Sequence, residues 1–328
     1  MNLLRFTRRA LHQQLRWVWV ATLCISASAY AEPAADCPPS ATIPSPERIQ
    51  AGMREARDHG FLWRIVKDAR TSFLFGTIHV ARLDWIFPGP EVAQALRASD
   101  TVALELDLLD PKVRRRLADA VAAVGEPELP APIKERLARQ MQSECIATET
   151  LASLGGPMQV VVLSALSARR DGLDPAYGID IFLAGFGRGA QKAVVSLETP
   201  ESQVQALLTT DPQASLAMVE NGLAELERGH ARPMLMRIAN VWAEADHAAL
   251  ARYDEWCECR DNDADRDTMK RMLDDRNPGM ADAIDALHAG GKNVFAAVGS
   301  LHMVGPLGLP ALLAQRGYEV QRVDFVHR

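Results

Sequence analysis

The sequence contains 328 residues, of which 48% are hydrophobic, and its 36 Lys and Arg against 42 Asp and Glu give a formal net charge of −6. A chain of this length can bury a substantial hydrophobic core, in one large domain or two small ones. The acidic balance argues against a nucleic acid or an anionic membrane surface as the main partner.

The first segment, residues 1–31, has the pattern of a secretory signal peptide. An apolar stretch, Trp17–Ala29, follows a basic region without acidic residues and leads into Ala29-Tyr30-Ala31, which resembles a signal-peptidase site. The stretch is short for a transmembrane helix, although an uncleaved N-terminal anchor is the alternative. Cleavage after Ala31 would leave residues 32–328 as a single domain of net charge −10, because residues 1–31 hold four arginines and no acidic residue.

This leader predicts a secreted, periplasmic protein. No later segment approaches about eighteen uninterrupted apolar residues, so we expect no integral membrane segment after cleavage.

The mature chain opens with strand patterns. Residues 61–67 and 72–77 alternate in the manner of strands, and Asp68-Ala69-Arg70 between them predicts a hairpin turn. A helix is expected from Pro90 to about residue 98, and residues 101–106 (TVALEL) predict a short strand.

The middle of the chain is mostly helical. Residues 111–170 have a helical pattern with breaks at 125–130 and 155–157, and a further helix is expected from Asp174-Pro175 to about residues 185–189. Strand patterns at 193–197, 293–298 and 318–325 enclose a mostly helical stretch, 200–287. Alternating strands and helices indicate an α/β fold, with a central mixed β-sheet flanked by helices and a largely helical middle region.

Four cysteines follow the leader: Cys37, Cys145, Cys257 and Cys259. An even number in an oxidising compartment predicts one or two disulfides, whose pairing the sequence leaves open. Cys257 and Cys259 are separated by a single residue, which is poor geometry for a mutual bond, so one of them is expected to reach Cys145 or Cys37. A thiolate metal site is the alternative.

The pattern Gly-[Thr/Ser]-[Ile/Leu]-His occurs twice, in GTIH ending at His79 and in GSLH ending at His302. Both copies follow predicted strands, and Glu105 and Glu198 lie at or beside the ends of two others. Ligands of open α/β sheets bind at the carboxyl ends of the strands, so we expect these four side chains to lie close together. A single histidine at a strand end is more commonly a structural residue, and the duplication is what favours a site.

Two imidazoles and one carboxylate form the ligand set of a catalytic metal site that keeps a position open for water. Such a metal lowers the pKa of water and polarises a carbonyl group. Glu105 lies in the apolar run VALEL and therefore needs a cation, a metal or a hydrogen-bond donor. The sequence thus predicts a divalent metal held by His79, His302 and Glu105.

From Leu62 to Val326 the chain resembles the TraB/GumN family, to which the Tiki metalloproteases are related. The matching pieces, in order, are FLFGTIHV, TVALELD, YGIDIFLAGFGRGAQKAVVSLETPESQ, DDRNPGMADAI and FAAVGSLHMVGPLGLPALLAQRGYEV. The resemblance implies an α/β fold of the kind shared with erythromycin-esterase and haem-binding ChaN-like proteins. It also implies peptide hydrolysis dependent on manganese or cobalt, with His79, His302 and Glu105 as the metal residues. The ligand set by itself suggests zinc, so Mn, Co and Zn all stay open.

Further catalytic roles can be proposed for three residues. Glu105 would be the third ligand or the general base, and Glu198 is the competing base, with a helix N-terminal cap as its alternative role. Arg276 could stabilise a developing oxyanion, with an ordinary ion pair to Asp274 or Asp275 as the alternative. The family segment LETPE also contributes Glu201.

Tyr177 and Asp180, three residues apart on one expected helix face, are candidates to line the site, with packing and capping as the alternative. The resulting hypothesis is a metal-dependent hydrolase acting on a peptide or small-molecule substrate. The alternative is a non-catalytic periplasmic protein that sequesters a peptide, a metal or a haem-like ligand.

Overall fold

The computed structural model describes residues 37–125, 128–257, 259 and 263–325. The predicted signal peptide, residues 1–31, lies outside these described residues, and the assignment of residues 32–328 to one domain stays a prediction.

The described part of the chain contains one six-stranded mixed sheet with the strand order β4-β3-β5-β2-β1-β6. Its strands are β1 (Phe61–Lys67), β2 (Arg70–Thr77), β3 (Thr101–Leu104), β4 (Ala193–Ser196), β5 (Val294–Gly299) and β6 (Glu319–Val323). Strands β4, β3, β5 and β2 pair in parallel, whereas β1 is antiparallel to both β2 and β6. The predicted strands and the mixed α/β class are confirmed.

The predicted hairpin joins β1 to β2 through a two-residue turn. Asp68 and Ala69 both have positive φ, 52° and 57°, as a type I′ turn requires, and this turn matches the twist of the flanking strands. Lys67 consequently pairs with Arg70 across the turn.

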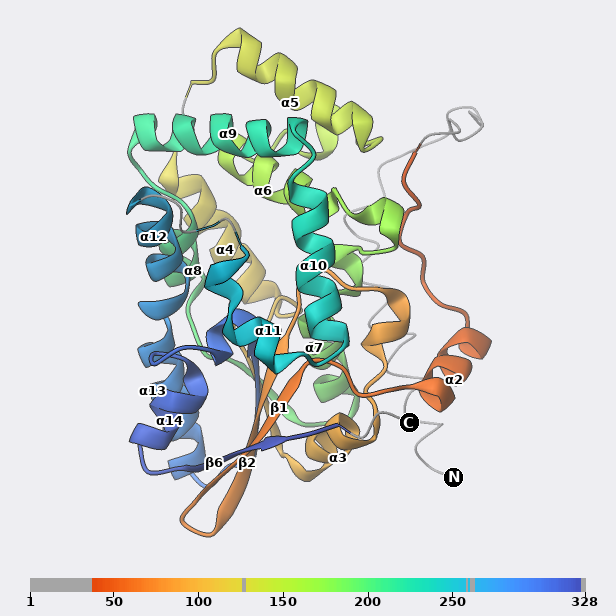
Figure 1. Cartoon of the computed structure of the whole chain (residues 1–328), viewed down its shortest axis with the longest axis vertical. Helices are drawn as coiled ribbons and strands as arrows, with labels where there is room; N and C mark the ends of the chain where they lie inside the picture. Colours follow the sequence, from red (N-terminus) through yellow and green to blue (C-terminus); the bar gives the residue numbers. More distant parts are fainter. Residues whose placement is uncertain (1–36, 126–127, 258, 260–262, 326–328) are drawn as a thin grey trace.

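The α-helices account for most of the described residues outside the sheet (Figure 1). Those before β4 are α2 (Pro46–Glu55), α3 (Pro90–Ala98), α4 (Pro111–Val124), α5 (Ala131–Ser143), α6 (Gly156–Leu166) and α7 (Ile179–Gly189). Those after β4 are α8 (Pro200–Leu207), α9 (Pro212–Glu227), α10 (Ala231–Ala243), α11 (His247–Ala251), α12 (Asp263–Met269), α13 (Asn277–Ala289) and α14 (Leu309–Gln315). Most begin with a proline in the first turn, where its missing N–H leaves no hydrogen bond unmade.

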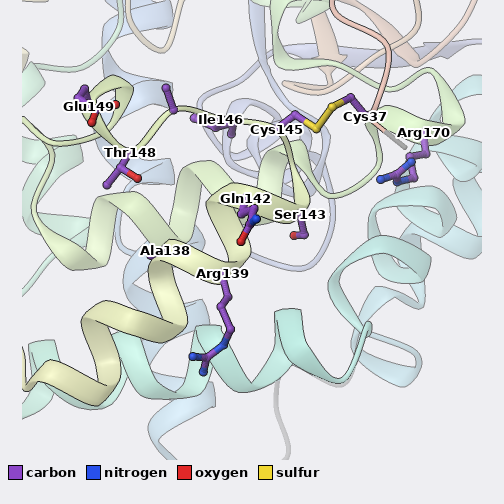
Figure 2. Close-up of a pocket in the computed structure, with 11 residues that line it drawn as sticks. Cys37, Ala138, Arg139, Gln142, Ser143, Cys145, Ile146, Thr148, Glu149 and Arg170 are labelled. Carbon is purple, nitrogen blue, oxygen red and sulfur yellow. A yellow bond between two sulfur atoms is a disulfide. The ribbon is translucent and has the colours of Figure 1, made fainter. Parts of the chain in front are cut away.

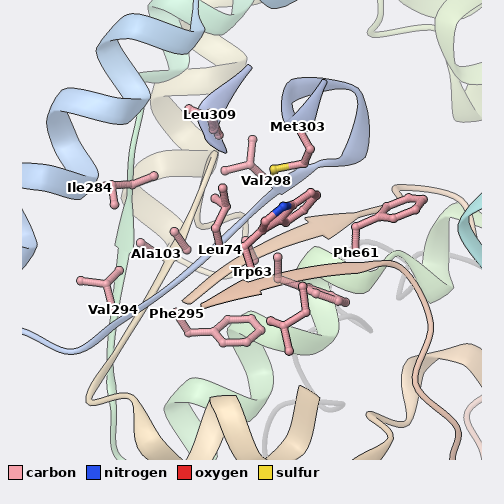
Figure 3. Packing of buried hydrophobic residues seen from close by; sticks show 14 of the residues in the cluster. Phe61, Trp63, Leu74, Ala103, Ile284, Val294, Phe295, Val298, Met303 and Leu309 are labelled. Atoms are coloured by element: carbon pink, nitrogen blue, oxygen red, sulfur yellow. The ribbon is translucent and has the colours of Figure 1, made fainter. Parts of the chain in front are cut away.

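Both faces of the sheet are buried. In β5, every residue from Val294 to Val298 is fully buried, as expected for a central parallel strand covered on both sides. Figure 3 shows Ile284 of α13 and Leu309 of α14 on one face, and Phe295 directed to the other. On that second face the ring of Phe295 lies 5.6 Å from the ring of Phe75.

The helical middle region forms a core of its own. Helices α5, α6 and α9 lie together at one end of the molecule (Figure 1), and they bury a separate cluster that includes Leu137, Leu163 and Leu223. Within the described residues we find no helix with the length and continuous hydrophobicity that a bilayer crossing requires.

The cysteine pairing corrects one expectation. Cys37 is bonded to Cys145, and Cys257 is bonded to Cys259, with Cα atoms 5.0 Å apart in the second pair. The prediction that Cys257 or Cys259 reaches Cys145 or Cys37 is therefore wrong. A Cα separation of this size lies within the usual range for a disulfide, so the single intervening residue does not prevent the bond.

The central position of Phe295 can be tested by Phe295→Ala, which removes a fully buried ring. We expect the free energy of unfolding to fall by about 3–5 kcal/mol, because the lost burial is compounded by a cavity. Urea denaturation followed by circular dichroism measures the change. Ile43→Ala, at a side chain that is 47% exposed, is the control and should change stability by less than about 0.5 kcal/mol. Equal effects for both variants would contradict the assignment.

Candidate active site at the carboxyl edge of the sheet

The parallel pairing of β2 with β5 places both Gly-x-x-His segments at the same level. Thr77, the last residue of β2, pairs with Gly299, the last residue of β5. His79 lies two residues beyond the first strand end and His302 three residues beyond the second. The two segments that carry these histidines are far apart in the sequence, but they begin at neighbouring strand ends.

Glu105 and Glu198 reach the same edge from β3 and β4. Leu104 pairs with Ala297 of β5 and with Ser196 of β4, so both glutamates follow strands that end close together. The backbone N–H of Glu198 donates to the carbonyl of Glu105 over 3.2 Å. The structure thus brings His79, His302, Glu105 and Glu198 together at the carboxyl edge of the sheet, as expected.

His79 is held by a carboxylate on α7. Its Nδ1 lies 2.7 Å from Oδ2 of Asp180, and Oδ1 of the same carboxylate accepts a 2.8 Å hydrogen bond from Thr77. An ionised carboxylate only accepts, so Nδ1 carries a proton, and in the neutral ring Nε2 is the unprotonated nitrogen. The imidazole is 64% exposed and Asp180 only 15%.

His302 is held by an amide at the start of α13. Its Nδ1 lies 2.5 Å from Oδ1 of Asn277, and the Asn277 amide N–H donates to the carbonyl of Leu307 over 2.8 Å. That second bond fixes the amide oxygen towards the imidazole, so Nδ1 again carries the proton. His302 and Asn277 are buried, with 3% and 1% of their surfaces exposed.

The Glu105 carboxylate lies between the two histidines. Its Oε1 accepts a 2.7 Å hydrogen bond from the backbone N–H of Gly299 and lies 3.9 Å from Nε2 of His79. A Cβ atom built on Gly299 would lie 3.2 Å from Glu105 Oε1 and 3.5 Å from His79 Nε2. The same atom would lie 3.7 Å from Cδ2 of His302. All three predicted ligands thus surround one glycine, and a larger residue there would press on them.

Arg276 joins the two glutamates. Its guanidinium donates to Oε2 of Glu105 over 2.6 Å and to both oxygens of Glu198, with Nε 3.0 Å from Oε1. Nη1 lies 3.3 Å from Nε2 of His302. The arginine side chain is 11% exposed and those of the two glutamates 8% and 7%, so the group forms a buried ion network.

Two ordinary alternatives are excluded by these contacts. Arg276 forms its ion pairs with Glu105 and Glu198 rather than with Asp274 or Asp275, and Asp275 pairs with Lys270. The N-cap of α8 is the Thr199 side chain rather than Glu198. Arg276 lies between a π-helical turn, Lys270–Asp274, and the start of α13. Such turns are frequent at functional sites.

Other candidates have different positions. Tyr177 lies in a separate 3-10 turn, so it does not share a helix face with Asp180; its hydroxyl bonds the backbone of Thr42. Glu201 pairs with Arg116 at the surface. The sequence interpretation did not select Gln203, whose amide lies 3.3 Å from Glu105 Oε2; it stands four residues after the LET motif.

The contacts within this group shift the pKa values of its members in different directions. The negative charge of Asp180, which outweighs partial burial, raises the pKa of His79 to about 9. Burial lowers the pKa of His302 to about 4. Burial works to raise the pKa of Glu105, but His302, His79, Arg276 and the Gly299 N–H together lower it to about 2. At neutral pH the site therefore holds an ionised glutamate, a charged His79 and a neutral His302.

The donor types fit a divalent cation. Both histidines direct Nδ1–H to a fixed oxygen acceptor, which is the arrangement that usually supports a metal-binding imidazole. The site contains three carboxylates, two of them (Glu105 and Glu198) on the Arg276 guanidinium and the third (Asp180) on His79, so the group carries surplus negative charge when both imidazoles are neutral. Among the residues that the structure describes, however, no three His, Cys, Asp or Glu side chains are arranged as a metal-binding group. Arg276 occupies the contacts to Glu105 and His302 that a cation would need.

A separate surface depression of about 1020 Å³ lies beside the Cys37–Cys145 disulfide. Figure 2 shows Arg139, Gln142 and Arg170 around it. None of its lining residues belongs to the histidine–glutamate site, so the two features are distinct.

The opposite pKa shifts of the histidines can be checked by NMR of the metal-free protein with ¹⁵N-labelled histidine. We expect the His79 resonance to titrate near pH 9 and that of His302 near pH 4, with assignments from His79→Gln and His302→Gln. Since folding raises the pKa of His79 above 6.5, its ion pair stabilises the protein fully below pH 6.5, and this contribution is lost as the pH rises through 9. Titration of both residues near pH 6.5 would contradict the geometry.

Comparisons with known proteins agree with the family resemblance of the sequence. The model of the TraB/PrgY/gumN family matches residues 61–322, which include both histidine segments, both glutamates and Arg276. The chain is 27% identical over 254 residues to the uncharacterized protein YbaP of Shigella flexneri, across 74% of this chain and 88% of that protein. No solved structure gives a significant match. The match over most of its length shows that the chain belongs to the TraB/PrgY/gumN family.

Proposed function

We propose that this protein is an exported, metal-dependent hydrolase that cleaves peptide bonds at the carboxyl edge of its sheet. The observation that carries the proposal is the convergence of Nε2 of His79, the imidazole edge of His302 and the Glu105 carboxylate around Gly299, with both Nδ1 atoms already bonded to oxygen. The two disulfides are compatible with an oxidising compartment such as the periplasm.

His79, His302 and Glu105 would hold the metal, which stays Mn, Co or Zn. Bound there, a divalent cation would supply Lewis-acid polarisation of a carbonyl and an acidified water. It would also balance the surplus charge of the three carboxylates, which the single guanidinium leaves uncompensated.

The other groups have roles that follow from their contacts. Glu198 uses both carboxylate oxygens on Arg276, so its part is to orient the guanidinium. Arg276, bearing a fixed positive charge at the edge of the site, would stabilise negative charge that develops on a substrate carbonyl. Glu105, with its pKa lowered to about 2, suits a permanently ionised ligand better than a general base, which works best near the ambient pH.

A non-catalytic binding protein is the second candidate, for peptide, metal or haem-like ligands. The observation that favours it is the contact of Arg276 with Glu105 and with His302. A site that has filled these positions with its own cation needs no metal to be stable.

The predicted ligands can be tested by His79→Ala, His302→Ala and Glu105→Gln. We expect each variant to bind Mn²⁺, Co²⁺ or Zn²⁺ more than about tenfold more weakly and to lose peptide cleavage, because each removes a donor atom. Metal competition against a fluorescent chelator and a peptide-library cleavage assay provide the two measurements. His230→Ala, at an exposed histidine paired with Glu225, is the control.

An unchanged metal content in His79→Ala would show that the ligand set is wrong. Tight metal binding by the wild type without cleavage across a broad library would favour the binding protein.

Arg276 and the cation should compete for the same carboxylate. We expect Arg276→Gln to bind the metal about tenfold more tightly, because one positive charge leaves the site, and yet to lose cleavage. Arg276→Lys should retain wild-type metal affinity within about threefold, since the charge stays. Thermal unfolding is monitored in parallel because removing one partner of a buried pair costs about 3–5 kcal/mol. Weaker metal binding by a folded Arg276→Gln would show that the arginine supports the metal rather than competing with it.

A further inference from the structure

The start of α7 is fastened to the exit of β2. The backbone N–H of Ile179 donates to the carbonyl of Ile78 over 3.1 Å, and Ala81 forms an isolated antiparallel bridge with Asp174. A Cβ atom at Gly178 would lie 2.8 Å from the carbonyl oxygen of His79, a distance that real Cβ atoms essentially never show. Only glycine permits this approach, and the approach brings Asp180 to the imidazole.

Asp180 is fully engaged by this arrangement. One oxygen lies 2.7 Å from Nδ1 of His79 and the other accepts a 2.8 Å hydrogen bond from Thr77. The Thr77 hydroxyl fixes the carboxylate in turn, since Thr77 is the last residue of β2 and is 1% exposed. The orientation of Asp180 is therefore set by the sheet itself.

The two histidines differ in how much packing supports them. His302 is 3% exposed, so the surrounding side chains hold its ring as well as Asn277 does. The His79 side chain is 64% exposed, which leaves little packing to fix the ring. Its direction depends on one hydrogen bond, whose loss would let the imidazole rotate and change tautomer.

We infer that Asp180 is a positioning residue for His79, which fixes the ring through Nδ1–H so that Nε2 is directed at Glu105 and is the unprotonated nitrogen of the neutral ring. This inference rests on the proposed metal site, because a free Nε2 is what a metal or a substrate proton would meet there. Asp180 itself contacts neither; it acts through the histidine.

The test uses Asp180→Ala and Asp180→Asn in the full chain, with Thr77→Val as a third variant. In the metal-free protein, ¹⁵N NMR of labelled histidine at pH 10 reports the His79 tautomer. We expect the Nδ1–H form in the wild type and in Asp180→Asn, whose amide oxygen can still accept, and the Nε2–H form in Asp180→Ala. Thr77→Val should give a mixture of the two.

Metal competition supplies the second readout. Asp180→Ala should bind Co²⁺ or Zn²⁺ about 10–100-fold more weakly, whereas Asp180→Asn should lose less than about tenfold. Asp285→Asn is the matched control. Asp285 is also a partly buried carboxylate, bonded to Lys67 and Tyr318, so its loss affects stability and should leave metal affinity unchanged.

The outcomes separate this inference from the proposed function. A wild-type protein that binds no metal overturns the metal site, while the tautomer measurement still decides the role of Asp180. A wild type that binds metal, together with an Asp180→Ala variant of unchanged affinity and tautomer, overturns the positioning role and leaves the metal site standing. Equal losses in Asp180→Ala and Asp285→Asn would mean that Asp180 is a stability residue only.

Discussion

The parallel register between β2 and β5 is the constraint on which the rest of the site depends. It sets Thr77 level with Gly299, and the Ser300 hydroxyl, donating to the Thr77 carbonyl over 2.8 Å, ties the two strand exits together. A slip of one residue would turn every side chain of the strand to the opposite face, and would break the contact between the rings of Phe75 and Phe295. The core thus enforces the register, and the register brings two distant histidines together.

The second constraint is the cost of keeping charge inside the protein. Two buried glutamates side by side repel each other, and each is expensive to bury alone. Arg276 solves both problems by bonding to Glu105 and Glu198 together. The Arg276 side chain must therefore start from a defined backbone position, which lies just after the π-helical turn Lys270–Asp274. Asn277, which follows Arg276 in the chain, contacts His302. Two consecutive residues after this local irregularity therefore belong to the site.

The sequence was sufficient for the features that depend on periodicity and on strand ends. The six strands, the hairpin at Asp68-Ala69 and the meeting of His79, Glu105, Glu198 and His302 all follow from patterns within a few residues. The partners of the charged groups did not follow. Arg276 has acidic residues beside it in the chain, but it bonds to Glu198, 78 positions away, because only the folded sheet edge offers buried carboxylates. The Cys257–Cys259 bond was likewise missed, since ring closure over one residue depends on backbone angles that composition does not reveal.

Each histidine of the site is held through Nδ1 by an oxygen acceptor, which is a carboxylate for His79 and a neutral amide for His302. Thr77, Asp180 and His79 form one chain of contacts, and the Leu307 carbonyl, Asn277 and His302 form the other. The carboxylate supports the exposed histidine and the neutral amide supports the buried one. This distribution follows from solvation: an ionised Asp180 beside a charged imidazole is tolerable where water reaches the ring, whereas a second carboxylate beside His302 would add uncompensated charge to a region that already contains Glu105 and Glu198. In both neutral rings Nε2 is therefore the unprotonated nitrogen, by different means, and the histidine that is charged at neutral pH is the one that solvent can reach.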